Sequence, residues 1–234
     1  MELLTPTQLR NLAEPQWLIE RLFPTGSFVV LYGPSGQGKS WIALDWAFHI
    51  ASGKLWQGLP VKQGPVIYIA AEGRGGLGQR VGAWETYYRS TDTPVYFSLE
   101  PLDILGDGPD ELLATCALFT ANPDEPETDL VPELIIVDTL ARCFAGDENE
   151  AVDMSKFVQG VDIFRRELGA TVLLIHHMGK DRDRGERGSS VLRGAADTMI
   201  RVTRNKDDSM LLKCSKQKDA VECEDITLRL LPVG

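Results

Sequence analysis

The chain has 234 residues, of which 43% are hydrophobic and 25% charged, a balance typical of a soluble globular protein that excludes a disordered or fibrous chain. Its apolar runs are much shorter than the roughly 20 residues that cross a bilayer, which excludes a transmembrane protein. The net charge of −10 argues against a general nucleic-acid binder.

Four cysteines are spread over the chain without a C-x-x-C pair, at Cys116, Cys143, Cys214 and Cys223. This spacing argues against a zinc finger or a disulfide scaffold and favours a reducing compartment. The N-terminal residues include charges and contain no long apolar region, so we expect no signal peptide. These features together predict a cytoplasmic location.

After a short lead-in, residues 1–24, apolar runs typical of buried strands alternate with segments of helical periodicity. Strands are expected at Phe28–Tyr32, Val66–Ala71, Val95–Ser98, Leu134–Asp138 and Thr171–His176. Helices are expected at Lys39–Ala51, Leu77–Tyr88, Asp110–Phe119 and Val152–Leu168, the last with Val152, Phe157, Val161, Phe164 and Leu168 facing inward. This alternation predicts βαβ units, and therefore an α/β fold with a mostly parallel central sheet flanked by helices.

Two segments lack apolar periodicity and are predicted as loops, Asn122–Glu133 and Met178–Gly194. The chain closes with three expected strands, Ala196–Thr203, Ser209–Cys214 and Ile226–Leu231. Because these strands follow one another without helices, we expect them to form an antiparallel C-terminal edge of the sheet. Neither a linker nor an internal repeat divides the chain, so residues 25–234 are predicted to be one domain.

A phosphate-binding motif directly follows the first strand and opens the first helix. The run matches G-x-x-x-x-G-K-[ST] with Gly33, Pro34, Ser35, Gly36, Gln37, Gly38, Lys39 and Ser40. Glycines allow backbone N–H groups to surround phosphate oxygens, and the helix N-terminus adds a favourable dipole. Lys39 is expected to contact the β- and γ-phosphates, and Ser40 to offer its hydroxyl to Mg²⁺.

Two acidic residues end apolar strands and are expected at the same sheet edge as this motif. Asp138 ends the strand Leu134–Asp138 and would hold Mg²⁺ through water, although a strand can also end in an Asp that acts only as a cap. The next residue is Thr139, so the adjacent Glu that many ATPases use to polarise water is absent. Glu72, after Val66–Ala71, is the predicted substitute that orients an attacking water; the alternative is a solvated Glu in a turn.

Two histidines, His176 and His177, end the strand that begins at Thr171. Adjacent strand residues face opposite ways, which argues against a shared metal. His177 could hydrogen-bond the γ-phosphate and report its presence to the following loop, or it could be a buried histidine that satisfies backbone groups.

Basic residues are concentrated in one part of the chain, since residues 178–218 carry a net charge of +5 and the remainder −15. The candidates for contacts with DNA phosphates are Lys180, Arg182, Arg184, Arg187 and Arg193. The segment lacks interleaved aromatic residues, so base stacking is not implied. A solvated loop without a ligand remains the alternative.

Lys216 and Lys218 lie two residues apart near the end of the chain and would point the same way on an extended strand. A pair of cations on one face is costly without an anionic partner. A γ-phosphate bound by a neighbouring subunit would be such a partner. Alternatively, the lysines protect an edge strand against aggregation.

Together these motifs resemble the RecA-like ATPases, and most closely the plasmid RepA-type hexameric replicative helicases with their phage-borne relatives. The resemblance covers about residues 15–220. It rests on the phosphate loop, Glu72, L-I-I-V-D-T, H-H-x-G-K, R-G-S-S-x-x-R-G-A-A-D, K-x-K-D and the lead-in Trp17-Leu18-Ile19 before Phe23-Pro24. The stretch Arg187–Asp197 with the histidine pair narrows the resemblance to this branch.

The resemblance implies a RecA core, with rings or filaments that bind ATP between subunits and single-stranded DNA at the centre. Lys39 and Ser40 would hold phosphates and Mg²⁺, Asp138 would be the Walker B acid and Glu72 the base. His177 would sense the γ-phosphate. The implied trans-acting cations are Lys216 and Lys218, with Arg193, Arg201 and Arg204 as substitutes. The loops after Asp138 and His177 would face DNA, although the loop Arg142–Glu150 is acidic and by itself a poor phosphate binder.

The sequence therefore predicts a Mg²⁺-dependent ATPase that acts on single-stranded DNA as the bare motor core of a ring-shaped replicative helicase, with a hexamer as the expected ring. Other replication or recombination proteins are expected partners, and a membrane is not. One alternative is a recombination or annealing ATPase that forms filaments. A second is a nucleotide-dependent switch that binds proteins and no DNA.

Overall fold

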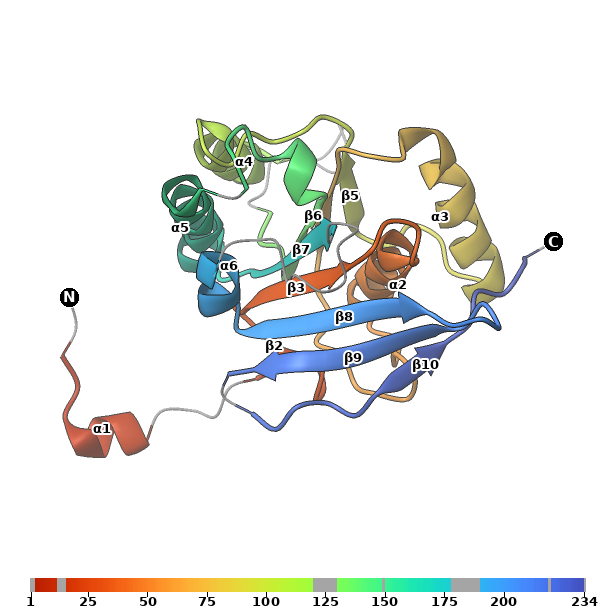
Figure 1. Ribbon diagram of the computed structural model, residues 1–234, viewed down its shortest axis with the longest axis horizontal. Helices are drawn as coiled ribbons and strands as arrows, with labels where there is room; N and C mark the ends of the chain where they lie inside the picture. Colours follow the sequence, from red (N-terminus) through yellow and green to blue (C-terminus); the bar gives the residue numbers. More distant parts are fainter. Residues whose placement is uncertain are drawn as a thin grey trace.

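The computed structural model of the chain describes residues 3–11, 16–119, 130–148, 150–177, 190–218 and 220–233. Within these residues, an eight-stranded sheet runs in the order β10-β9-β8-β3-β7-β6-β4-β5 (Figure 1). Its strands are β3 (Phe28–Gly33), β4 (Val66–Ala70), β5 (Val95–Ser98), β6 (Leu134–Asp138), β7 (Thr171–His177), β8 (Thr198–Arg204), β9 (Met210–Gln217) and β10 (Ile226–Leu228). Neighbours from β8 to β5 are parallel, whereas β8–β9 and β9–β10 are antiparallel. The predicted fold class, with its antiparallel C-terminal edge, is confirmed.

Helices cover both faces of the sheet (Figure 1). The helices are α1 (Pro6–Arg10), α2 (Lys39–Ser52), α3 (Arg74–Tyr88), α4 (Gly108–Ala117), α5 (Ala151–Leu168) and α6 (Ser190–Ala195), with a 3₁₀ turn η1 (Leu140–Arg142). The core on one face includes α2 and α3, and the core on the other face includes α4, α5 and α6. Because both faces are covered, β3, β4 and β6 are apolar and buried along almost their whole length.

The second half of the lead-in packs against the domain. Trp17–Ile19 (β1) and Phe23–Pro24 (β2) pair as a small antiparallel sheet. Leu18 and Leu22 are fully buried in the same core as α2, and the ring of Phe23 lies 5.2 Å from that of Trp46 in an edge-on arrangement. Residues 17–24 thus contribute apolar burial to the α2 side of the sheet.

Two details of the predicted helices are wrong. Val152 is 65% exposed, because the buried stripe of α5 begins at Met154 and continues through Phe157 and Val161, which leaves Val152 off that face. In addition, the final residues of the predicted loop Met178–Gly194 form the short helix α6, which is fixed by burial of Leu192 against α5.

The ends of the last strands also differ from prediction. β9 continues to Gln217 because it pairs with β8 along this length, whereas β10 ends at Leu228. Residues 178–189 of one predicted loop and residues 122–129 of the other lie outside the described residues. None of the helices in the described part of the chain has the length and apolar character needed to span a bilayer.

Candidate active site

The phosphate loop connects the end of β3 to the start of α2, as the motif predicts. Gly33, Gly36 and Gly38 all have positive φ, and a Cβ at Gly33 would collide with the Val202 carbonyl of β8. Glycine is therefore required at that position. Gly38 is the N-cap of α2 and contributes no side-chain cap, so the first-turn N–H groups of α2 are free of a capping side chain and suited to an anion.

Lys39 is 3% exposed and already oriented within the loop. Its Nζ donates to the carbonyls of Gly33 at 2.9 Å and Pro34 at 2.8 Å, and lies 2.9 Å from Nδ1 of His177. Burial lowers the pKa of Lys39 to about 8, and the nearby carboxylates of Asp138 and Glu72 oppose this effect. An anionic phosphate would relieve the cost of this buried charge.

Asp138 ends β6 and is 4% exposed. The hydroxyl of Tyr68 donates to its Oδ2 at 2.7 Å, while Oδ1 is buried and has no hydrogen-bond partner within the described residues. Burial raises the pKa of Asp138, and hydrogen bonding from Tyr68 and Ser40 opposes the rise. A buried carboxylate oxygen without a partner, beside the Ser40 hydroxyl, fits the oxygen ligands that Mg²⁺ prefers.

Glu72 follows β4 and lies beside Asp138, because β4 and β6 are parallel neighbours that pair Ala70 with Asp138. Its Oε1 accepts from Thr139 Oγ1 at 3.2 Å and from Arg142 Nε at 3.3 Å. Its Oε2 lies 3.7 Å from Nε2 of His177. The structure thus brings the two predicted strand-end acids together.

His177 pairs with Gly33 across β3 and β7, which places its ring at the phosphate loop. The Lys39 ammonium can only donate, so Nδ1 of His177 is the acceptor and Nε2 carries the proton toward Glu72. Burial and the charge of Lys39 lower the pKa of His177, which agrees with a neutral ring. His176 is buried, so the two histidines have separate surroundings.

These residues line a cavity of about 260 Å³ at the carboxyl edge of the sheet. Arg80 and Arg204 also line it, and the backbone N–H of Arg204 donates to Oε1 of Gln37, which ties the phosphate loop to the end of β8. Beside the cavity, a groove of about 400 Å³ runs between α2, α3 and the C-terminal segment. Trp41 and Arg80 line both spaces, and the Arg80 guanidinium lies 4.6 Å from the centre of the Trp41 ring.

Sequence reasoning missed Tyr68, Trp41 and Arg80. Tyr68 lies within an apolar strand, where it is indistinguishable from a core residue. Trp41 directly follows Ser40, and Arg80 is spaced three residues after Leu77 and four before Trp84, on the buried side of α3. This charged residue within an apolar stripe was the available signal.

Lys216 and Lys218 lie at the opposite edge of the sheet. Residue Lys216 pairs with Met199 near the start of β8, whereas Arg201 pairs with Tyr32 beside the phosphate loop. The Nζ of Lys216 donates to backbone carbonyls at the end of α6, among them Arg193 O at 2.7 Å. The expectation of a cation pair without partners is therefore wrong.

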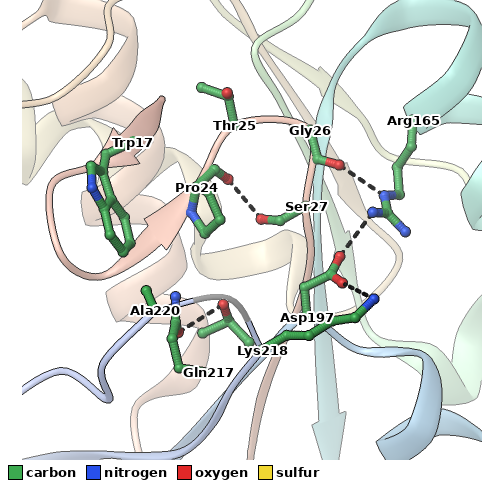
Figure 2. Close-up of a pocket in the computed structure, with 11 residues that line it drawn as sticks. Trp17, Pro24, Thr25, Gly26, Ser27, Arg165, Asp197, Gln217, Lys218 and Ala220 are labelled. Atoms are coloured by element: carbon green, nitrogen blue, oxygen red, sulfur yellow. Dashed lines mark hydrogen bonds and ion pairs between the residues drawn. The ribbon is translucent and has the colours of Figure 1, made fainter. Parts of the chain in front are cut away.

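Lys218 contacts Asp197 in a cavity of about 490 Å³ at this opposite edge (Figure 2). Its Nζ lies 3.4 Å from Oδ1 of Asp197, and Oδ2 of Asp197 accepts from Nη2 of Arg165 at 2.8 Å and from the backbone N–H of Phe28 at 2.9 Å. Neither Lys216 nor Lys218 lines the cavity at the phosphate loop of its own chain.

The structure locates only one of the candidate DNA contacts. Arg193 is exposed on α6. The other four candidates lie outside the described residues, at Lys180, Arg182, Arg184 and Arg187.

Comparisons with known proteins agree with this architecture. A family model described as an AAA domain matches residues 5–183. The structure resembles the ATPase domain of a helicase, with a TM-score of 0.62 and 12% identity over 88% of this chain and 82% of that one. It also resembles the RadB recombinase, with a TM-score of 0.59 and 15% identity over 88% of each chain. The predicted RecA-like P-loop fold is confirmed.

Proposed function

Because the chain belongs to the AAA domain family, we propose that it is a Mg²⁺-dependent ATPase motor that acts on single-stranded DNA. One observation carries the proposal. A phosphate loop with a buried lysine, a carboxylate oxygen without a partner and a second carboxylate beside a histidine all line or adjoin one cavity in the described part of the chain. This set matches the requirements of phosphoryl transfer to water.

The residues divide the chemistry among them. The loop N–H groups and Lys39 bind the phosphates and stabilise the charge that develops on the γ-phosphate. Glu72 orients the attacking water and accepts its proton at a carboxylate oxygen. His177 donates from Nε2 and links the γ-phosphate position to the end of β7. Ser40 and Oδ1 of Asp138 would hold Mg²⁺, which when bound neutralises phosphate charge.

The adjoining groove is the proposed place of the nucleoside. Trp41 offers an aromatic face, and Arg80 offers a planar cation stacked on it. Both residues also line the phosphate cavity, so a triphosphate held by the loop would extend its nucleoside past them into the groove.

We propose that hydrolysis is completed by a neighbouring copy of the chain. Lys216 and Lys218 lie far along the strands from the loop of their own chain, so the phosphate they could reach is one bound by an adjacent subunit. Such an arrangement requires a ring or a filament. The ring, as the motor core of a replicative helicase, is the preferred assembly, with Lys180, Arg182, Arg184, Arg187 and Arg193 contacting DNA.

The first test is ATP turnover of the purified chain with and without a single-stranded oligonucleotide. We expect turnover that requires Mg²⁺ and increases with DNA, and a loss of about a hundredfold or more in Lys39→Ala. Lys62→Ala is the matched control, since Lys62 forms an exposed ion pair with Glu133 away from the cavity. Turnover that persists in Lys39→Ala would contradict the proposed site.

A second candidate is a recombination or annealing ATPase, which the similarity to the RadB recombinase favours. Electron microscopy with ATP and DNA separates the two, because a helicase motor forms closed rings and a recombinase coats DNA as helical filaments. DNA binding that weakens as salt increases distinguishes both from a switch that binds only proteins.

A further inference from the structure

We propose that Arg142 restrains Glu72 while no nucleic acid is bound, and that a nucleic-acid phosphate releases this restraint by attracting Arg142. The inference deepens the proposed function and rests on it, because it assumes that Glu72 orients water and that the ligand is single-stranded DNA. It assigns a positioning role to Arg142, which sequence reasoning left without one.

The contacts of Glu72 show the restraint. Oε1 receives hydrogen bonds from both Thr139 Oγ1 and Arg142 Nε, and Oε2 faces Nε2 of His177. A carboxylate oxygen that already accepts two hydrogen bonds, one of them from a cation, has little capacity left to accept a proton from water. Glu72 is therefore held at the site in a form poorly suited to act as a base.

Arg142 is placed to leave this contact without disturbing the fold. It ends the 3₁₀ turn η1, whose Leu140 is buried, and the next residue, Cys143, is buried as well. The backbone is thus anchored on both sides, whereas the side chain of Arg142 is 64% exposed. An exposed ion pair of this kind is weak and is exchanged readily for a stronger anionic partner.

The surrounding charges select Arg142 as the phosphate contact of this segment. It is the only basic residue from Leu134 to Ser155, and the residues that follow it include Asp147 and Glu148. These acids repel a phosphate from the rest of the loop. A guanidinium binds phosphate in a bidentate manner, so a DNA backbone that approaches η1 competes directly with Glu72.

The consequence is a link between DNA contact and hydrolysis that needs only one side chain to move. When Arg142 turns to a phosphate, Oε1 of Glu72 keeps the Thr139 hydrogen bond and regains an acceptor position for water. Thr139 then holds the carboxylate in place while it acts.

The test is ATP turnover of the full chain in Arg142→Ala with no DNA present. We expect turnover to increase about fivefold, the upper range for loss of an exposed ion pair, and further stimulation by DNA to be reduced. Arg142→Lys, which keeps the charge but lacks Nε, should remain closer to the original chain. Arg166→Ala is the matched control, since Nε of Arg166 pairs with Glu167 at 2.6 Å on the exposed side of α5.

Two further variants make the outcome decisive. Adding Glu72→Gln to Arg142→Ala should abolish the increase, which shows that the gain acts through Glu72. A DNA-free rate that is unchanged or lower in Arg142→Ala, in a variant with unaltered thermal unfolding, overturns the inference. That result leaves the proposed function standing if Lys39→Ala still abolishes turnover, whereas turnover that survives in Lys39→Ala refutes the proposed function itself.

Discussion

The two edges of the sheet hold their charges in different ways. At the carboxyl edge, Lys39 is buried with a lowered pKa, and Oδ1 of Asp138 has no partner within the described residues. At the amino edge, Asp197 is paired with Arg165, Lys218 and a backbone N–H. The first arrangement is costly without a ligand, and the second is satisfied within the chain. The difference indicates that the carboxyl edge binds the ligand and that the amino edge can present a cation without losing stability.

The largest expected effect separates the roles of the two edges. Lys218→Ala should lower ATP turnover about a hundredfold, because a trans-acting cation contributes strongly to the transition state. Its effect on the free energy of unfolding should be small, since Asp197 keeps Arg165 and the Phe28 N–H. Lys216 is less suitable, because its removal also leaves carbonyls of α6 without a donor.

Mixing two inactive variants tests whether Lys218 acts across subunits. In a mixture of Lys39→Ala and Lys218→Ala, some interfaces combine an intact Lys39 from one copy with an intact Lys218 from the next. Turnover should therefore recover partly on mixing. If Lys218 acted within its own chain, the mixture would stay as inactive as the separate variants.

The next effect concerns the stability of the carboxyl edge. Tyr68→Phe removes the donor to Oδ2 of Asp138 and leaves the buried carboxylate with less compensation. We expect the free energy of unfolding to fall by about 2 kcal/mol, as for other hydrogen bonds to charged groups. Urea unfolding measures this loss, and Mg²⁺ with a nucleotide analogue should recover part of it. An unchanged midpoint with an unchanged slope would contradict the assigned contact.

The fold and the phosphate loop could be predicted because their signals are local. Strand runs such as Phe28–Tyr32 and the G-x-x-x-x-G-K-[ST] spacing depend on residues close in the sequence. Glu72 and His177 were predicted because parallel strands end at a common edge. The contacts of Tyr68 and Lys216 could not be predicted, because they depend on which strands pair and in which register, and no local pattern encodes this.

A pH profile gives an effect of about tenfold and isolates Lys39. Its pKa is about 8 in the folded chain and 10.5 as a free side chain, so between these values the unfolded chain holds a proton that the folded chain has lost. Lys39 therefore makes the folded state more stable as pH increases through this window, while nucleotide affinity falls by up to about tenfold per pH unit above pH 8. Titration calorimetry from pH 7 to 10 checks the affinity.

Lys39→Arg is the control for this profile, because arginine remains protonated over the whole range. Its nucleotide affinity, although lower, should be independent of pH between 8 and 10. A profile that keeps the same slope in Lys39→Arg would assign the titration to another group.

The smallest expected effect tests where the nucleoside lies. Trp41 is 37% exposed, and its stacking with Arg80 is the main aromatic contact beside the phosphate cavity. Trp41→Ala should weaken ATP binding about threefold to fivefold, the range of an exposed cation–π contact, and leave binding of inorganic tripolyphosphate unchanged. Calorimetry with both ligands measures the difference, with Leu118→Ala at the end of α4 as the control for loss of an exposed apolar side chain. An equal loss for both ligands would place the contribution of Trp41 in the phosphate loop itself, because only a contact with the nucleoside can distinguish the two.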